Sequence, residues 1–283
     1  MSHLLACTDG SLYAASLHQH AAWVAGKTGW GVTLVHVIER EESRPAADLT
    51  GSIGFDAGQE LLQQLVELDE AHARVARLRG KALLEDGAKQ LAEAGVEPVV
   101  TLQRHGSLVE NLVDLEEDAS LVIIGKRGEH ADFAKGHIGS NLERVVRSSQ
   151  IPVLVASRAF QPIQKVLIAF DRGPSALKAV HFAATNPLFE ELKITLLSTG
   201  RENESLEREL QNVATGLRGA HRRVEAEFVV GDPEETIAAE VEARGIDLLV
   251  MGAYGHSRIR QLIIGSTTTA LLRTCHVPVL LFR

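Results

Sequence analysis

The sequence predicts an α/β fold in which two doubly wound parallel sheets of five strands each follow one another along the chain. Strand-like and helical patterns alternate over the 283 residues, and the order of these elements repeats once. In addition, the runs LVIIG, LLVMG, PVLVA and PVLLF are apolar throughout. Such runs are typical of strands that helices cover on both faces, and their alternation with helices produces parallel sheets with right-handed crossovers.

The repeat divides the chain into two copies of one domain. HLLACTDG and KVLIAFDRG both carry an apolar run to an aspartate, Asp9 or Asp171, before an Ala-rich helical pattern. Later in each half, a strand is followed by a glycine-rich loop, Gly-Ser, a helix, a proline and a last strand. We therefore place the domains at 1–160 and 161–283, both within the usual size range.

Each half is expected to contain five strands. In the first half they are predicted near residues 3–8, 31–38, 97–104, 120–125 and 151–156. In the second half they are predicted near residues 165–170, 192–198, 224–230, 246–252 and 277–282. Ligands of such sheets bind beyond the carboxyl ends of the strands, near the switch in strand order. This rule directs attention to Asp9, Asp171 and the two glycine-rich loops.

The first half also carries an insertion at about residues 40–94. It begins with a loop at 40–57, which is a candidate lid or a surface insertion. A helical pattern then runs from Gln59 to Ala94. Its stripe ELLQQLVELDEAHARVARL is expected to pack on its own domain rather than bind a partner.

Composition and charge narrow the class of protein. The net charge of −8 disfavours binding to nucleic acid, and no apolar run approaches the roughly 20 residues of a membrane span. The first residues lack the features of a secretion signal, so we expect a cytoplasmic protein without a membrane partner. Cys7 and Cys275 are expected to be reduced and packed.

The glycine-rich loop of the second half is the main candidate site. Gly252 and Gly255 directly follow a strand, and Gly265-Ser266-Thr267 begins a helix. Glycines let backbone N–H groups converge, and a helix start adds free donors and a positive dipole end, which favours phosphate. The alternative is a structural joint in which Ser266 only caps the helix.

With these residues the chain resembles the universal stress protein family, in its tandem type. Gly252, Gly255, Gly265 and Ser266 match the family pattern Gly-x2-Gly-x9-Gly-Ser/Thr, and VLIAFD and VVGDPEETI are also similar. The resemblance implies Rossmann-like domains of the adenine-nucleotide-binding type that bind ATP, alone or with Mg²⁺. It assigns ribose to Asp171, adenine to the backbone near Ser198 and Thr199, and phosphates to the glycine loop with Ser266 and Thr267.

The corresponding positions of the first half follow the pattern less closely. They are Asp9, Val37, Gly125, Gly128, Gly139 and Ser140. Ten residues instead of nine separate Gly128 from Gly139, and Glu129 and Asp132 bring negative charge to the loop. We therefore expect ATP chiefly in the second half.

The resemblance also implies that the last strand of each half lies at a sheet edge, so that the halves associate as an intramolecular pseudo-dimer. A further homodimer and a protein partner are left open. The function favoured is an ATP-binding, nucleotide-linked regulator of stress response. The alternatives are a nucleotide-independent scaffold and a carrier of a small or lipid-like molecule in the first half.

Catalytic and metal chemistry find little support in the sequence. We find no set of nucleophile, base and orienting group, which limits the expectation to slow ATP hydrolysis at most, without catalytic residues. Histidine spacing does not favour a metal site, and the histidines are expected to be solvated or capping. Asp118 and Asp247 are expected to cap or end structure, and LEEDAS to be a solvated charge run.

Overall fold

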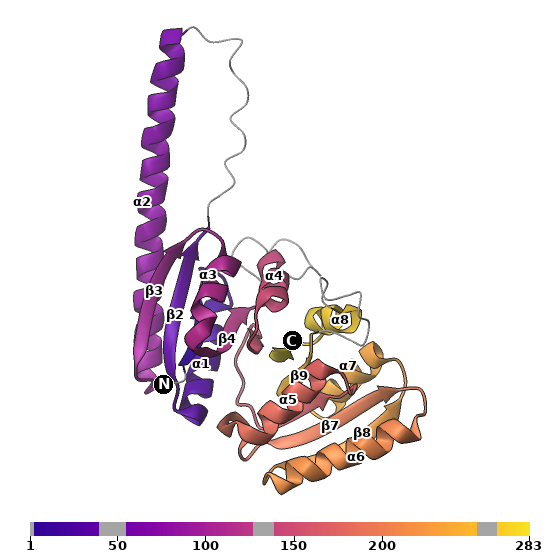
Figure 1. Ribbon diagram of the computed structural model, residues 1–283. Coiled ribbons are helices and arrows are strands. Elements are labelled where there is room, and N and C mark those ends of the chain that lie inside the picture. Colours follow the sequence, from indigo (N-terminus) through magenta and orange to yellow (C-terminus); the bar gives the residue numbers. More distant parts are fainter. Residues whose placement is uncertain (1–2, 40–54, 127–138, 254–264) are drawn as a thin grey trace.

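The computed structural model describes residues 3–39, 55–126, 139–253 and 265–283 (Figure 1). All ten predicted strands are present. Those of the first half are β1 (His3–Cys7), β2 (Gly31–Ile38), β3 (Val99–His105), β4 (Ala119–Gly125) and β5 (Val153–Ala156). Those of the second half are β6 (Lys165–Ala169), β7 (Lys193–Gly200), β8 (Arg223–Val230), β9 (Leu248–Gly252) and β10 (Val279–Phe282).

Helices alternate with the strands, as the sequence predicts. The first half contains α1 (Ala14–Thr28), α2 (Phe55–Glu93), α3 (Leu108–Leu115), η1 (Glu116–Asp118) and α4 (Ser140–Ser148). The second half contains α5 (Pro174–Thr185), η3 (Pro187–Phe189), α6 (Glu204–Gly219), α7 (Pro233–Ala243) and α8 (Ser266–Thr274). The doubly wound α/β fold class is therefore confirmed.

The two five-stranded sheets are joined edge to edge. The strand order is β3-β2-β1-β4-β5-β10-β9-β6-β7-β8, and pairing is parallel within each half. At the centre, β5 and β10 pair antiparallel, with Leu154 opposite Leu280. The last strand of each half thereby covers the edge of the other, which removes two apolar edges from solvent.

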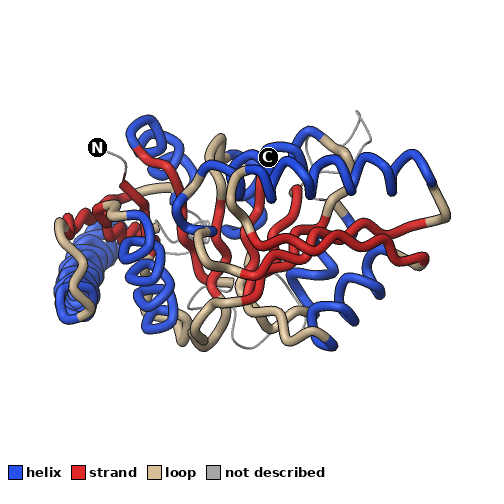
Figure 2. Tube along the Cα trace, turned by 90° about the horizontal axis from the view of Figure 1, so that it is seen from below, coloured by secondary structure: helices blue, strands red, loops and turns tan. Residues whose placement is uncertain are grey.

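Two core layers follow from this sheet, one on each face. Alternate strand residues pack with α1, α2, α5 and α6 on one face and with α3, α4, α7 and α8 on the other. Figure 2 shows the strands running between helices on the two sides. Both layers continue from the first half into the second, so the halves share their core.

Helix α2 differs from the prediction in how it is supported. It connects β2 to β3, as α6 connects β7 to β8, but it has 39 residues where α6 has 16. Leu84 and Leu91, near its end, are buried on the sheet, whereas residues 63–75 are all exposed and the helix projects beyond the domain (Figure 1). The expectation that the stripe packs on its own domain is therefore wrong for its described residues.

Two glycines let the end of α2 approach the sheet closely. A Cβ atom at Gly87 would lie 2.6 Å from Leu34 Cδ2 and 2.8 Å from the ring of His18. Both neighbours are themselves buried in the core. At Gly80, a Cβ atom would meet the side chains of Gln103 and His36. The helix contacts β2 and β3 through these side-chain-free positions.

Two histidines of α1 are buried, which corrects the expectation that they are solvated or capping. His18 and His20 are 4% and 0% exposed. His18 contacts the Thr8 hydroxyl at 3.0 Å through Nε2 and Gln90 Oε1 at 3.0 Å through Nδ1, so it links β1 to α2. His20 Nδ1 donates to the Ser16 carbonyl at 2.7 Å, and its ring packs edge-on against Phe160. Burial lowers the pKa of both imidazoles.

Two acidic residues accept hydrogen bonds from backbone N–H groups of distant segments. Asp247 Oδ2 accepts the backbone N–H groups of Gln164 and Lys165 at 2.9 and 2.8 Å, which fixes the start of β6 and agrees with its expected structural role. Glu116, within LEEDAS, is buried, and its Oε2 accepts the Gln150 N–H at 2.8 Å. The interpretation of LEEDAS as a solvated run is therefore wrong at Glu116.

We predict that Gly87→Ala destabilises the protein although alanine is the better helix former. The added methyl group enters a filled core, which costs about 1–3 kcal/mol. Gly216→Ala in α6, where a Cβ atom would meet nothing within 4 Å, should instead stabilise by up to about 1 kcal/mol. Chemical denaturation of both variants measures the difference. A stabilised Gly87→Ala would contradict the packing of α2.

We predict that stability falls as the pH drops below about 6.5, the pKa of histidine in an unfolded chain. The folded pKa of His20 lies below that value, so the unfolded state binds more protons in this window and is stabilised relative to the folded state as the pH falls. His20→Leu should reduce the slope of unfolding free energy between pH 5 and 6.5 by up to about 1.4 kcal/mol per pH unit. The exposed His276 provides the control through His276→Leu. An unchanged slope in His20→Leu would contradict the assignment.

Candidate functional site

The sheet brings the predicted residues of the second half to one edge. β6 lies between β9 and β7, so the strand order switches direction at β6. Asp171 follows β6, Ser198 and Thr199 lie near the end of β7, and Gly252 ends β9. Their strands are parallel, and therefore these residues lie at the carboxyl edge beside the switch point, where α/β sheets bind ligands.

Asp171 is held by a tight turn before α5. Its Oδ1 accepts the N–H of Gly173 at 2.8 Å, and Arg172 between them has a positive φ of 67°. A Cβ atom at residue 173 would lie 2.9 Å from Asp171 Oδ1, so glycine is needed there. The carboxylate is oriented by the backbone while the residue stays exposed at the sheet edge.

The end of β7 presents backbone rather than the Ser198 side chain. Ser198 is 1% exposed, and its hydroxyl donates to the Phe170 carbonyl, which ties the ends of β6 and β7 together. Thr199 is half-buried next to Gly200, whose φ is 141°. The Ser198 hydroxyl is thus occupied within the fold, and the assignment of adenine to the backbone near Ser198 and Thr199 stays a prediction.

The two described ends of the glycine loop lie side by side. The N–H of Gly265 donates to the Ala253 carbonyl at 3.1 Å, and Thr268 Oγ1 donates to the Gly252 carbonyl at 3.1 Å. Gly252 also lies against the first turn of α5, where a Cβ atom would come within 2.9 Å of Ser175 Cβ. The end of β9 and the start of α8 are therefore in direct contact. Gly255 lies outside the described residues.

The start of α8 differs from those of α6 and α7. Asn203 caps α6 by accepting from Leu206 N at 3.1 Å, and Asp232 caps α7 by accepting from Glu234 N at 2.9 Å. At α8 the N-cap is Gly265, and no described side chain caps the helix. Ser266 is the first helical residue and is exposed, so the alternative in which it serves as the N-cap is wrong. Backbone donors at this helix start thus remain available to an anion.

Comparison with known proteins agrees with this geometry. The family model described as "Universal stress protein family" matches residues 1–157 and, a second time, residues 162–283. Universal stress protein Slr1230 from a Synechocystis strain is 40% identical over 288 residues, and the match covers 100% of both chains. The chain belongs to the universal stress protein family.

Solved structures of the family share the whole fold. A universal stress protein from Archaeoglobus fulgidus has a TM-score of 0.77 at 18% identity, covering 99% of this chain and 98% of that one. A putative universal stress protein from Pseudomonas aeruginosa has a TM-score of 0.65 at 17% identity, covering 100% and 93%. At these identities the likeness shows the two-domain fold alone.

In the first half, the predicted site residues lie at positions equivalent to those of the second half. Asp9 Oδ1 accepts the Ser11 N–H at 3.0 Å after β1, Gly125 ends β4, and Gly139 is the N-cap of α4, without a described capping side chain. Val37 is half-buried on β2. Ser140 begins α4, and Gly128 lies outside the described residues.

The two copies differ in the first turn of the helix that follows each loop. Thr268 is the third residue of α8, and Leu142 is the third residue of α4. The hydroxyl bridge from Thr268 to the strand end therefore has no equivalent at Leu142. Thr268 and Gly173 were not predicted from the sequence, although the STTT run and the glycine before Pro174 were the available signals.

The cysteines are not reactive groups of either site. Cys7 and Cys275 are buried free thiols, as the sequence predicts. Burial raises the pKa of both, most strongly for Cys7 at the end of β1. A thiol with a raised pKa is a poor nucleophile and metal ligand near neutral pH.

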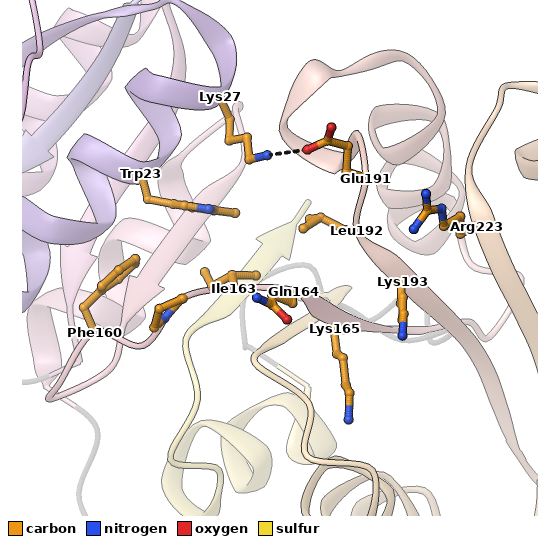
Figure 3. A pocket seen from close by; sticks show the side chains of 11 residues that line it. Trp23, Lys27, Phe160, Ile163, Gln164, Lys165, Glu191, Leu192, Lys193 and Arg223 are labelled. Carbon is orange, nitrogen blue, oxygen red and sulfur yellow. Dashed lines mark hydrogen bonds and ion pairs between the residues drawn. The ribbon is translucent and has the colours of Figure 1, made fainter.

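A hollow lies at the opposite ends of the strands. It is about 510 Å³ in volume, and Lys165, Lys193 and Arg223, the first residues of β6, β7 and β8, line it (Figure 3). Among the other lining residues, Lys27 of α1 pairs with Glu191 at 3.3 Å, and Trp23 of α1 points toward Ile163 and Leu192 of the second half. This hollow is distinct from the glycine-loop edge.

Two features of the described residues concern metal and membrane binding. Among them, no group of three or more His, Cys, Asp and Glu side chains is arranged to hold a metal ion. His130 and His137 lie outside the described part of the chain. In the same part of the chain, no helix has the length and apolar character needed to cross a bilayer.

Proposed function

We propose that the second half binds ATP at the carboxyl edge of β9, β6 and β7 and that the chain is a nucleotide-linked regulator. The observation that carries the proposal is the junction of Gly252 and Ala253 with Gly265. It closes the loop beside a helix start whose N–H donors no described side chain caps. Phosphates are the ligands that such donors and the helix dipole favour.

The remaining groups fit an adenosine moiety. Asp171, oriented by the Gly173 N–H, supplies carboxylate oxygens to ribose hydroxyls, and the exposed backbone beyond β7 supplies donors and acceptors to adenine. Ser266 and Thr267 add hydroxyl donors to phosphate oxygens. ATP enters alone or with Mg²⁺. Ligand-linked regulation then requires that ATP bind two states of the loop with different affinities.

The domain organisation is part of the same proposal. Residues 1–160 and 161–283 act as two domains that associate as an intramolecular pseudo-dimer through β5 and β10. The first domain retains the turn at Asp9 and the glycines at the end of β4 and before α4. Its longer, more acidic loop and Leu142 in place of a threonine make it a weaker ATP site.

The site can be tested with a variant that does not disturb the fold. Ser266 makes no capping bond, so Ser266→Ala should leave the thermal midpoint unchanged. It should weaken ATP binding roughly tenfold or more, because a hydrogen bond to a charged group contributes about 1.5–3 kcal/mol. Calorimetric titration with ATP, with and without Mg²⁺, measures the effect. Ser205→Ala, an exposed serine in the first turn of capped α6, is the matched control.

Substitution of one loop glycine in each half tests which half binds ATP. Gly255→Val should abolish ATP binding and Gly128→Val should have a smaller effect. Equal retention of ATP in both variants would contradict the assignment to the second half.

Mass spectrometry of small molecules released from freshly purified protein distinguishes the alternatives. Release of a nucleotide supports the proposal, and release of a lipid-like molecule supports the carrier. Release of no ligand, together with no ATP binding, supports the scaffold.

A further inference from the structure

Residues 63–75 of the projecting part of α2 are all exposed, so no other described segment of the chain covers them. Contact with the sheet begins near Arg77, whose carbonyl accepts Gln103 Nε2 at 3.1 Å, and at Gly80. The preceding helical residues, 55–76, extend about 33 Å at 1.5 Å per residue (Figure 1). Helices of this kind gain most of their stability from tertiary packing of an apolar face, so a packing partner is expected for this segment.

Apolar side chains form a continuous line on the helix, which we call the outer stripe. Its members follow the alternating spacing of three and four residues that is typical of a coiled-coil seam: Leu68, Ala71, Val75, Leu78 and Ala82. Leu68, Val75 and Leu78 are 51%, 63% and 62% exposed. Exposed leucine and valine in coiled-coil register indicate a helical partner rather than solvent.

The outer stripe faces away from the domain. At 100° per residue, it lies about 170° around the helix from the row that packs on the sheet, which consists of Gly80, Leu84, Gly87 and Leu91. Ala82 is exposed although it lies within the packed part of the helix. A second helix can therefore run along the stripe without meeting its own domain's sheet.

Charged residues beside the stripe identify the partner. Acidic Glu67, Asp69 and Glu70 lie beside the first part of the stripe, and basic Arg74, Arg77 and Lys81 lie beside the rest of it. If Leu68 packs against Ala71 of a second copy running the opposite way, Glu67 lies beside Arg74 of that copy, and the reciprocal pair forms as well. A parallel alignment would instead place Arg74 beside Arg79 of the second copy. The antiparallel arrangement thus pairs opposite charges beside the stripe at Glu67 and Arg74, where the parallel arrangement brings two arginines together.

We propose that two copies of this chain associate through an antiparallel coiled coil of their α2 helices. The overlap runs from about residue 57 to residue 82 in each helix, and the two domains lie at opposite ends of it. The acidic half of the segment disfavours an anionic membrane as the occupant. This interface is independent of the ATP site, so each proposal can fail alone.

The oligomeric state of the full chain tests the proposal. Sedimentation velocity over a concentration series should show a monomer–dimer equilibrium that Leu68→Ser with Val75→Ser weakens at least tenfold. Both side chains are exposed, so the thermal midpoint of the monomer should not fall. Leu177→Ser with Val113→Ser removes exposed apolar side chains elsewhere, from α5 and α3, and should leave the equilibrium unchanged. A monomer at all concentrations, or a dimer indifferent to the stripe, would overturn the proposal.

Exchange of the charges at Glu67 and Arg74, and a distance between spin labels on the two copies, test the antiparallel orientation of the helices. Glu67→Lys should weaken the dimer, and Glu67→Lys with Arg74→Glu should restore it, because the exchanged pair again faces opposite charge. Spin labels at Glu85→Cys should be about 46 Å apart in the antiparallel dimer and within about 15 Å in a parallel one. The native cysteines are buried and should not be labelled. A short distance, or failure of the double variant to restore the dimer, would overturn the antiparallel arrangement.

Discussion

The antiparallel pairing of β5 with β10 is the interaction on which the rest of the architecture depends. Each strand is the last of its half, is apolar throughout, and would otherwise end a sheet with open hydrogen-bonding groups. Their pairing makes one ten-stranded sheet, and the packed layers on both faces then continue across the seam. Two repeats that could each form a separate sheet are thereby held in one core.

The same pairing brings the strand ends of each half into contact with the last helix of the other half. Lys126, directly after β4, donates to the Cys275 carbonyl at the end of α8 at 2.7 Å. Arg283, directly after β10, reaches the Ser148 carbonyl at the end of α4 at 3.4 Å. Each half therefore contacts the last helix of the other half at the end of its own strands.

Sequence patterns predicted the elements better than their surroundings. All ten strands were predictable because buried parallel strands have continuous apolar sequences that turn residues bound. Two features depend on tertiary distances that one sequence does not contain. A helical pattern does not reveal where the underlying sheet ends, so the projection of α2 was missed. Burial of His18 depends on the Thr8 hydroxyl and Gln90, which is 72 residues away in the chain.

The site shows the same division. The spacing of Gly252, Gly265 and Ser266 was sufficient to locate a strand end and a helix start that meet. The role of Ser266 as the first helical residue instead of the cap could not be predicted, because serine is favoured at both positions of a helix start. Thr268 was missed since its partner is a backbone carbonyl, which carries no sequence signal.

Hydrogen–deuterium exchange at the β5–β10 seam tests the central claim most directly. If this pairing unites the halves, the amides of Val153–Val155 and Val279–Leu281 exchange as slowly as those of β1 and β6, with the same opening free energy, since only global unfolding exposes them. Exchange at the seam that is orders of magnitude faster, while β1 and β6 remain protected, would show that the halves fold and open separately and would contradict the account.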